Sequence, residues 1–468
     1  MQIGPLILYS ALVGALTGLL AAGLNWLLNI IQTYVLGQTL GYLPPGLTSE
    51  GELSQAFTGP TYWWLVLVLP IIFALSSYLG SGRGLGWLLA AYRRGQNVRA
   101  VEYLRGVLGS VVQLGSGSPF GREGPMAAIG LWIGGTLGRR IPLGEGSKFL
   151  PFAGMAAGFA AAFHAPMAGA LLASEIVYRG LALEAGALAP ALIGALAGFT
   201  VYGFLQGYTP LIELTPGAFQ WAHLAFGLLL GLVCAGVGTL WLESERFLQI
   251  YLRRVRFPVR HAAFGLMLGV VLLFMPEAVG GGLAWVQLGA TPILSLQFIA
   301  VLFLVQLALL ILGGGVRTYG GQLTPAITLG GLAGLILTHL VAQVFPWMAP
   351  PLETAALVGM AALLAGIARA PFAALVFVGE LGAYSLLPVA LVAVFAAYAF
   401  TSPRGSFEVG EVSPETPTTP PGSGLSPGLS SDVSPGFSPG TDGLKATRPE
   451  TSPQTSPPPP NPAEGGST

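Results

Sequence analysis

Residues 154–175 read GMAAGFAAAFHAPMAGALLASE, and residues 359–380 read GMAALLAGIARAPFAALVFVGE. Both stretches open on Gly-Met-Ala-Ala, carry Ala-Pro at the same place and end on a glutamate, in a constant register of 205 residues. Three matches in one register indicate an internal duplication. Duplicated membrane proteins often bind their substrate between the halves, near the midplane, through broken helices. We therefore expect a site between two related halves, and two stacked copies without a central site are the alternative.

Composition places these repeats in a lipid bilayer. Hydrophobic residues make up 53% of the chain and charged residues 9%, whereas soluble domains carry about 25% charged residues. Residues 6–36 and 295–315 contain no charge at all. Because a helix of about 20 apolar residues crosses the hydrocarbon core, we predict an all-α polytopic membrane domain over residues 1–401.

The domain divides at a basic segment and is followed by a tail of different composition. We place the halves at residues 1–245 and 260–401, joined by a linker at 246–260. From residue 402 onward Pro, Ser, Thr and Gly dominate. Such a composition cannot bury enough apolar surface to fold, so the tail 402–468 should be disordered.

Arginines and lysines gather in three segments, at residues 93–105, 139–148 and 246–260. Basic loops tend to remain on the cytoplasmic side, so we expect these loops, and with them the tail, to be cytoplasmic. The balanced charge of 20 basic and 20 acidic residues gives no reason to expect a nucleic-acid partner. The lack of targeting signals favours a prokaryotic plasma membrane.

Three glycine-rich breaks interrupt the apolar stretches: GSGRG at 80–84, GSGSPFGREGP at 115–125 and GGQLTP at 320–325. Glycine allows a tight turn and proline suits the first turn of a helix, so each break predicts a helix N-terminus at membrane depth. Such an end presents free N–H groups and a partial positive charge, which suit an anion. The Ser81 hydroxyl would add a donor. The alternative is that the glycines only let helices pack closely.

Glu123 lies inside the second break, between apolar stretches. An ionisable residue within a membrane domain indicates function. Its carboxylate could compete with an anion for the helix end, and protonation would release it. A buried pair with Arg122 is the alternative, although neighbouring residues on a helix do not face each other.

At this point the residues resemble a known family. GREGP at 121–125 is identical to a signature of the CLC family of chloride channels and chloride/proton antiporters. The resemblance continues through FHAPMAGALLASE at 163–175, GGQLTP at 320–325 and RAPFAALVFVGEL at 369–381, and GSGRG at 80–84 matches half of the family's serine motif. It implies an inverted repeat of tilted and broken helices and a homodimer with one anion pathway per subunit.

The resemblance also implies roles for single residues. Ser81 would coordinate the inner or central anion, and Glu123 would be the external gate. The backbone amides of Gln322 and Leu323 would line the central anion site. Phe407 is the closest placement for the family's pore tyrosine, since Tyr384 and Tyr398 fit the register less well.

Two departures from the family pattern bear on mechanism. Arg83 and Gly84 stand where an apolar residue and a proline are usual. Ile176 occupies the position of the internal proton glutamate, and isoleucine cannot carry a proton. Glu175 is interpreted as a structural group repeated at Glu380. His164 is either a packing residue or a substitute proton relay, because histidine titrates near neutral pH.

We therefore expect chloride, or a similar small anion, to be exchanged for protons through Glu123. A passive chloride channel without proton coupling is the alternative, suggested by Ile176. A membrane-embedded enzyme is a remote third reading, because the chain has four histidines, one cysteine and no aspartate before Asp432. We expect no enzymatic activity, no metal and no cofactor apart from the transported chloride.

Overall fold

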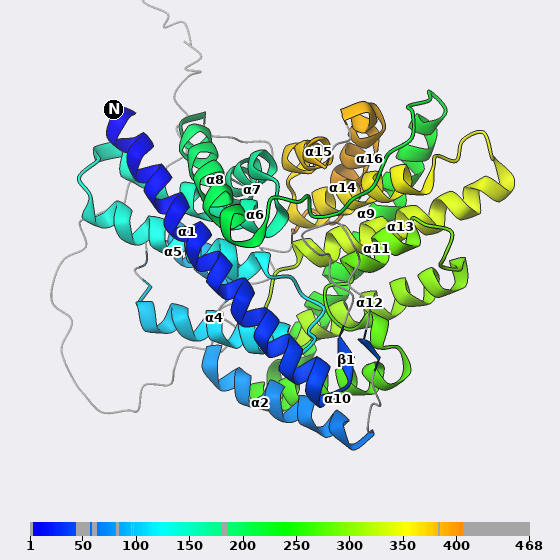
Figure 1. Cartoon of the computed structure of the whole chain (residues 1–468), viewed down its shortest axis with the longest axis horizontal. Coiled ribbons are helices and arrows are strands. Elements are labelled where there is room, and N and C mark those ends of the chain that lie inside the picture. The colour runs from blue at the N-terminus through cyan, green and yellow to red at the C-terminus, as the bar shows by residue number, and fades with distance from the viewer. Residues whose placement is uncertain are drawn as a thin grey trace, which may run out of the picture. The chain divides into compact units, whose positions relative to one another are not determined.

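A computed structural model describes residues 3–43, 57–58, 63–80, 84–94, 96, 98–178, 185–381 and 384–405 (Figure 1). The first helices are α1 (Ile3–Gln32), α2 (Val68–Gly80), α3 (Leu85–Arg93), α4 (Ala100–Gly115), α5 (Glu123–Arg140), α6 (Leu150–Phe163), α7 (Pro166–Tyr178) and α8 (Ala185–Gln206). The later ones are α9 (His223–Tyr251), α10 (Phe257–Phe274), α11 (Leu283–Gly289), α12 (Leu296–Val316), α13 (Leu323–Val344), α14 (Leu352–Ala368), α15 (Pro371–Glu380) and α16 (Leu387–Phe400).

Short elements connect these helices. Two strands, β1 (Tyr42–Leu43) and β2 (Phe57–Thr58), pair antiparallel. Short segments of π or 3₁₀ helix lie at Thr33–Thr39, Trp63–Leu67, Gly144–Phe149, Leu252–Arg254, Pro276–Ala278 and Tyr384–Leu386.

The two halves repeat the same helix contacts. Helix α5 packs on α6 as α13 packs on α14, and α1 packs on α8 as α9 packs on α16. Glycines allow these close approaches. A Cβ atom on Gly130 of α5 would lie 1.8 Å from the carbonyl oxygen of Gly154 in α6. The equivalent atom on Gly330 of α13 would lie 2.2 Å from the carbonyl oxygen of Gly359 in α14, so both contacts require glycine.

Two glutamates also form hydrogen bonds between the halves. Glu175, near the end of α7, accepts hydrogen bonds from the N–H groups of Phe372 (3.0 Å) and Ala373 (2.7 Å) at the start of α15. Glu380, at the end of α15, accepts them from Met167 (2.8 Å) and Ala168 (2.7 Å) at the start of α7. Each carboxylate caps the helix on which its counterpart stands. This exchange accounts for the repeated glutamate as a structural group.

The equivalence of α1 and α9 corrects the predicted boundary between the halves. Helix α9 starts at His223 and continues to Tyr251, so the break falls between α8 and α9, at residues 207–222. The predicted linker 246–260 instead comprises the end of α9, a 3₁₀ turn and the start of α10. The basic residues mark the end of a long helix, because leucine, glutamate and arginine all favour helix and let α9 continue past its apolar part.

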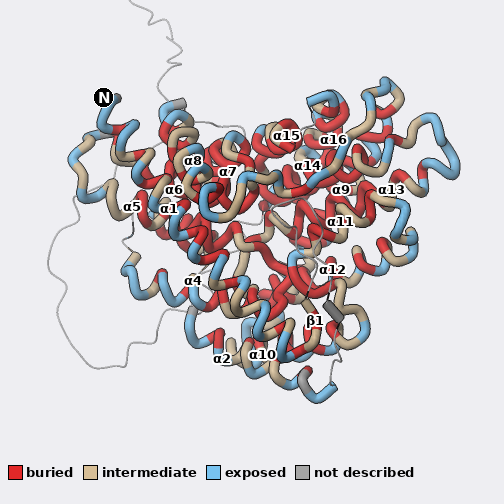
Figure 2. Tube along the Cα trace, in the orientation of Figure 1, coloured by how far each residue is buried: buried red, intermediate tan, exposed pale blue. Residues whose placement is uncertain are grey.

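Burial follows the expectation for a protein surrounded by lipid. Every residue of α6 is buried, and buried residues fill the centre of the described part (Figure 2). Large apolar side chains such as Trp26 (64% exposed), Phe204 (82%) and Phe274 (84%) point outward. Six of the described helices are long and apolar enough to cross a membrane. The predicted all-α, multi-pass fold with an inverted repeat of tilted, broken helices is confirmed.

The tail 402–468 was predicted to be disordered, and residues beyond 405 lie outside the described part. Ser402 still belongs to the folded domain, because its N–H donates to Thr239 (3.0 Å) and its hydroxyl to Glu243 (2.6 Å), both on α9.

Candidate functional site

Two helix N-termini, one from each half, lie next to each other. The backbones of Gly121 and Gly321 form an antiparallel bridge, with N–H to carbonyl distances of 2.8 and 2.7 Å. Helix α5 begins just after Gly121 and α13 just after Gly321, and each has a proline in its first turn, Pro125 and Pro325. Two of the three predicted helix ends are therefore adjacent.

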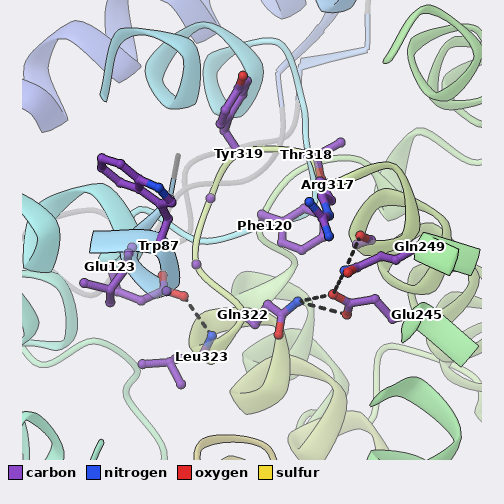
Figure 3. A pocket seen from close by; sticks show the side chains of 17 residues that line it. Trp87, Phe120, Glu123, Glu245, Gln249, Arg317, Thr318, Tyr319, Gln322 and Leu323 are labelled. Atoms are coloured by element: carbon purple, nitrogen blue, oxygen red, sulfur yellow. Dashed lines mark hydrogen bonds between the residues drawn. The ribbon is translucent and has the colours of Figure 1, made fainter. Parts of the chain in front are cut away.

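The Glu123 side chain from α5 occupies the end of α13 (Figure 3). It is fully buried. Its carboxylate accepts hydrogen bonds from the N–H groups of Leu323 (2.8 Å) and Thr324 (3.0 Å) and from the Thr324 hydroxyl (2.6 Å). Free N–H groups at a helix start bind anions, and here they bind a carboxylate. Arg122 donates instead to Asn25 Oδ1 at 2.5 Å, so the alternative pair of Arg122 with Glu123 is not what holds the carboxylate.

Glycines make room for this carboxylate. A Cβ atom on Gly121 would lie 1.8 Å from Glu123 Oε2, and one on Gly321 would lie 2.1 Å from Glu123 Oε1. Gly320, with a φ of 138°, has a backbone conformation that L residues rarely adopt. Any side chain at positions 121 or 321 would push the carboxylate away from the helix end.

A cavity of about 130 Å³ adjoins Glu123. Its wall includes Trp87, Phe120, Arg317 and Tyr319, and it reaches Gly84 at the start of α3. Gly84 belongs to the first glycine-rich break, so all three breaks contribute to one place. Ser81 and Phe407, the predicted anion ligands, lie outside the described residues.

Gln322 and Leu323 lie at the start of α13, next to Glu123 and the cavity. The Leu323 N–H binds Glu123, whereas the Gln322 side chain donates to both carboxylate oxygens of Glu245 from α9, at 2.9 and 3.0 Å. Glu245 also lines the cavity and accepts from Gln249 Nε2 at 3.1 Å. Sequence reasoning missed Glu245. It follows a long apolar stretch of α9, and a charge within a membrane helix is a signal of function, but Glu243 and Arg246 flank it and made it look like the start of the basic segment.

The residues considered for proton transfer lie elsewhere. Ile176 is buried, and its carbonyl oxygen accepts from Arg93 at 2.8 Å. His164 has a left-handed φ of 53° between α6 and α7, with Nδ1 2.5 Å from the Thr209 carbonyl oxygen. Among the described residues, no three His, Cys, Asp or Glu side chains gather as a metal site would need.

Comparison with known proteins agrees with this geometry. The profile of the voltage gated chloride channel family matches residues 80–402. An H(+)/Cl(-) exchange transporter ClcA from Salmonella arizonae is 27% identical over 401 residues, which cover 80% of each chain. A slow cyanobacterial Cl-/H+ antiporter superposes with a TM-score of 0.72 at 22% identity, over 84% of this chain and 94% of its own. A CLC-type fluoride/proton antiporter gives the same TM-score and identity, over 87% and 98%.

Because the family profile spans more than two thirds of the sequence, and the fold and the paired helix ends agree with it, the chain belongs to the voltage-gated chloride channel family.

Proposed function

We propose that this protein exchanges chloride for protons across a membrane, with Glu123 as the gate. Anion transport is the coarse function that the family and the resemblance to exchange transporters support. The observation that carries the finer proposal is the Glu123 carboxylate bound by two N–H groups and one hydroxyl at the start of α13. A carboxylate held there stands where a chloride ion would bind.

Competition for one set of donors couples the two ions. A charged Glu123 fills the helix end and excludes chloride. When the carboxyl group takes up a proton it loses its charge, so the partial positive end of α13 holds it less strongly. The side chain then leaves, chloride takes its donors, and the bound proton leaves with the glutamate. Each cycle thus moves one ion in exchange for the other.

The remaining anion ligands belong to the same proposal. The Leu323 N–H would bind chloride once Glu123 has left, together with the Gln322 N–H, the Ser81 hydroxyl and residue Phe407. The absence of a full positive charge on α13 suits transport, because an ion that is held too tightly does not leave.

A passive chloride channel is the second candidate. Ile176 favours it, because an isoleucine stands where the exchange mechanism of the family uses a second carboxylate. In this reading Glu123 opens and closes the path but carries no net proton flux.

Proton movement in liposomes distinguishes the two functions. Purified protein would be reconstituted with a chloride gradient and no proton gradient, and the external pH would be recorded. We expect uphill proton movement that stops in E123Q, since glutamine retains the size of the side chain but cannot release a proton. Rapid chloride flux without proton movement would contradict exchange and leave the channel.

We propose further that the protein is a homodimer in a prokaryotic plasma membrane. A mass of twice 48.3 kDa, measured by light scattering after correction for detergent, is the expected result, and a single-chain mass would contradict it.

A further inference from the structure

Glu245 is a buried carboxylate with no role in the mechanism above. Only 3% of the residue is exposed, and it lies within the membrane helix α9. Its direct partners, Gln322 and Gln249, are neutral amides. Arg317, at the end of α12, acts on it electrostatically. Placing an ionisable group in such a position is costly, and in membrane proteins it marks ion paths and proton relays.

Glu245 and Glu123 line the same cavity (Figure 3). Gln322 connects them, because its side chain holds Glu245 while the next residue, Leu323, binds Glu123 through its N–H. The cavity, of about 130 Å³, has room for several water molecules. The side-chain oxygens of Gln322 and Gln249 are buried with no hydrogen-bond partner among the described residues. Water in the cavity would satisfy them and could conduct a proton.

The place of Glu245 along α9 suits entry from the cytoplasm. Helix α9 ends at Tyr251, six residues or about 9 Å beyond Glu245. The arginines at 253–260 follow directly, and such basic segments remain on the cytoplasmic side. Glu245 therefore lines the cavity from a position close to the basic end of α9, and Gln322 lies between Glu245 and Glu123 in Figure 3.

We propose that Glu245 is the second proton-carrying group of the transport path and replaces the carboxylate that is missing at Ile176. This inference rests on the proposed exchange of chloride for protons. Cytoplasmic water gives a proton to the Glu245 carboxylate. The neutral acid passes that proton through cavity water to the Glu123 carboxylate and regains its charge. Glu123 then leaves the end of α13. The charged groups facing this transfer in the cavity are Arg317 and Glu123.

The test measures chloride flux and proton flux separately in the same liposomes, for the wild type, E245Q and E243Q. Glu243 is a matched control on α9, with its side chain 48% exposed. We expect E245Q to carry chloride but to lose uphill proton movement, and E243Q to keep the wild-type ratio of protons to chloride. A purely structural role for Glu245 would lower both fluxes together and leave their ratio unchanged, which would overturn the proposal.

A second variant, in which the side chains of residues 245 and 322 are exchanged, tests the proposal if E245Q does not fold. The double variant E245Q/Q322E moves the carboxylate across the same hydrogen bond, and we expect it to regain proton movement. Chloride flux without proton movement in this variant would overturn the proposal. If the wild type itself moves no protons, the exchange function fails and this inference fails with it. If the wild type and E245Q move protons equally, only this inference fails.

Discussion

The Thr324 hydroxyl is the shortest of the three contacts to Glu123, at 2.6 Å. The other two donors are backbone N–H groups, which any residue except proline supplies. The hydroxyl is therefore the one contact that a side-chain substitution can remove. It adds a third donor to a carboxylate that the helix end already holds, so in the proposed mechanism it would stabilise the closed gate.

Replacing Thr324 by valine should weaken the closed gate. Valine has the same shape but no hydroxyl, and a hydrogen bond to a charged group contributes about 1.5–3 kcal/mol. Since 1.4 kcal/mol corresponds to a factor of ten, we expect chloride efflux at neutral pH to rise by about tenfold. In the proposed mechanism acidification opens the gate by protonating Glu123, so efflux in T324V should also depend less on acidification. T324S keeps the hydroxyl and should behave as the wild type, and a slower efflux in T324V would count against the gate.

At the scale of helices, the exchanged caps of α7 and α15 hold the two halves together. Both glutamates accept two N–H groups through two oxygens. Their surroundings differ, because Glu175 is fully buried whereas Glu380 is only partly buried. An unpaired N–H group costs more where water cannot reach it.

Glutamine at either position should destabilise the fold, and more so at 175. The amide offers one oxygen where two are needed, so one N–H group loses its acceptor. We expect E175Q to cost about 1–3 kcal/mol and E380Q less, read as melting temperatures of the detergent-purified protein. The exposed Glu213 provides a control, E213Q, that should leave the melting temperature unchanged. An equal or larger loss in E380Q would show that burial does not set the cost.

At the scale of the whole molecule, the two halves share the same helix arrangement but contribute different groups to the site. Glu123 of the first half corresponds to Leu323 of the second, 200 residues later. One half thus supplies a carboxylate and the other supplies the helix end that binds it. In the proposed mechanism, this difference makes one helix end the gate and the other its binding site.

The orientation of the helices relative to the membrane can be tested with an introduced cysteine. Cys234 is the only cysteine in the chain and is fully buried, so it should react little with a charged maleimide. We expect R254C, in the exposed turn after α9, to be labelled in inside-out vesicles and protected in right-side-out cells. The opposite labelling pattern would place the basic segments on the outer side and reverse the proposed direction of proton entry.

Much of this architecture follows from the sequence because it depends on local properties. Hydrophobic runs identify membrane helices wherever they pack, and a repeat in constant register shows the duplication without any coordinates. Glycines with a proline a few residues later mark the start of α5 and of α13, and a charged residue between apolar segments marks Glu123. The roles of Ser81, Gln322 and Phe407 in binding chloride stay predictions.

The tertiary structure decided which of these features meet. Glu245 and Gln322 are 77 residues apart in the chain. The sequence around either residue does not indicate that the two are in contact. The same holds for the exchanged caps, whose partners are about 200 residues apart. The break between the halves also became visible only from the matching contacts of α1 and α9. Composition and register belong to one segment at a time, whereas a hydrogen bond between distant helices depends on how all the intervening helices pack.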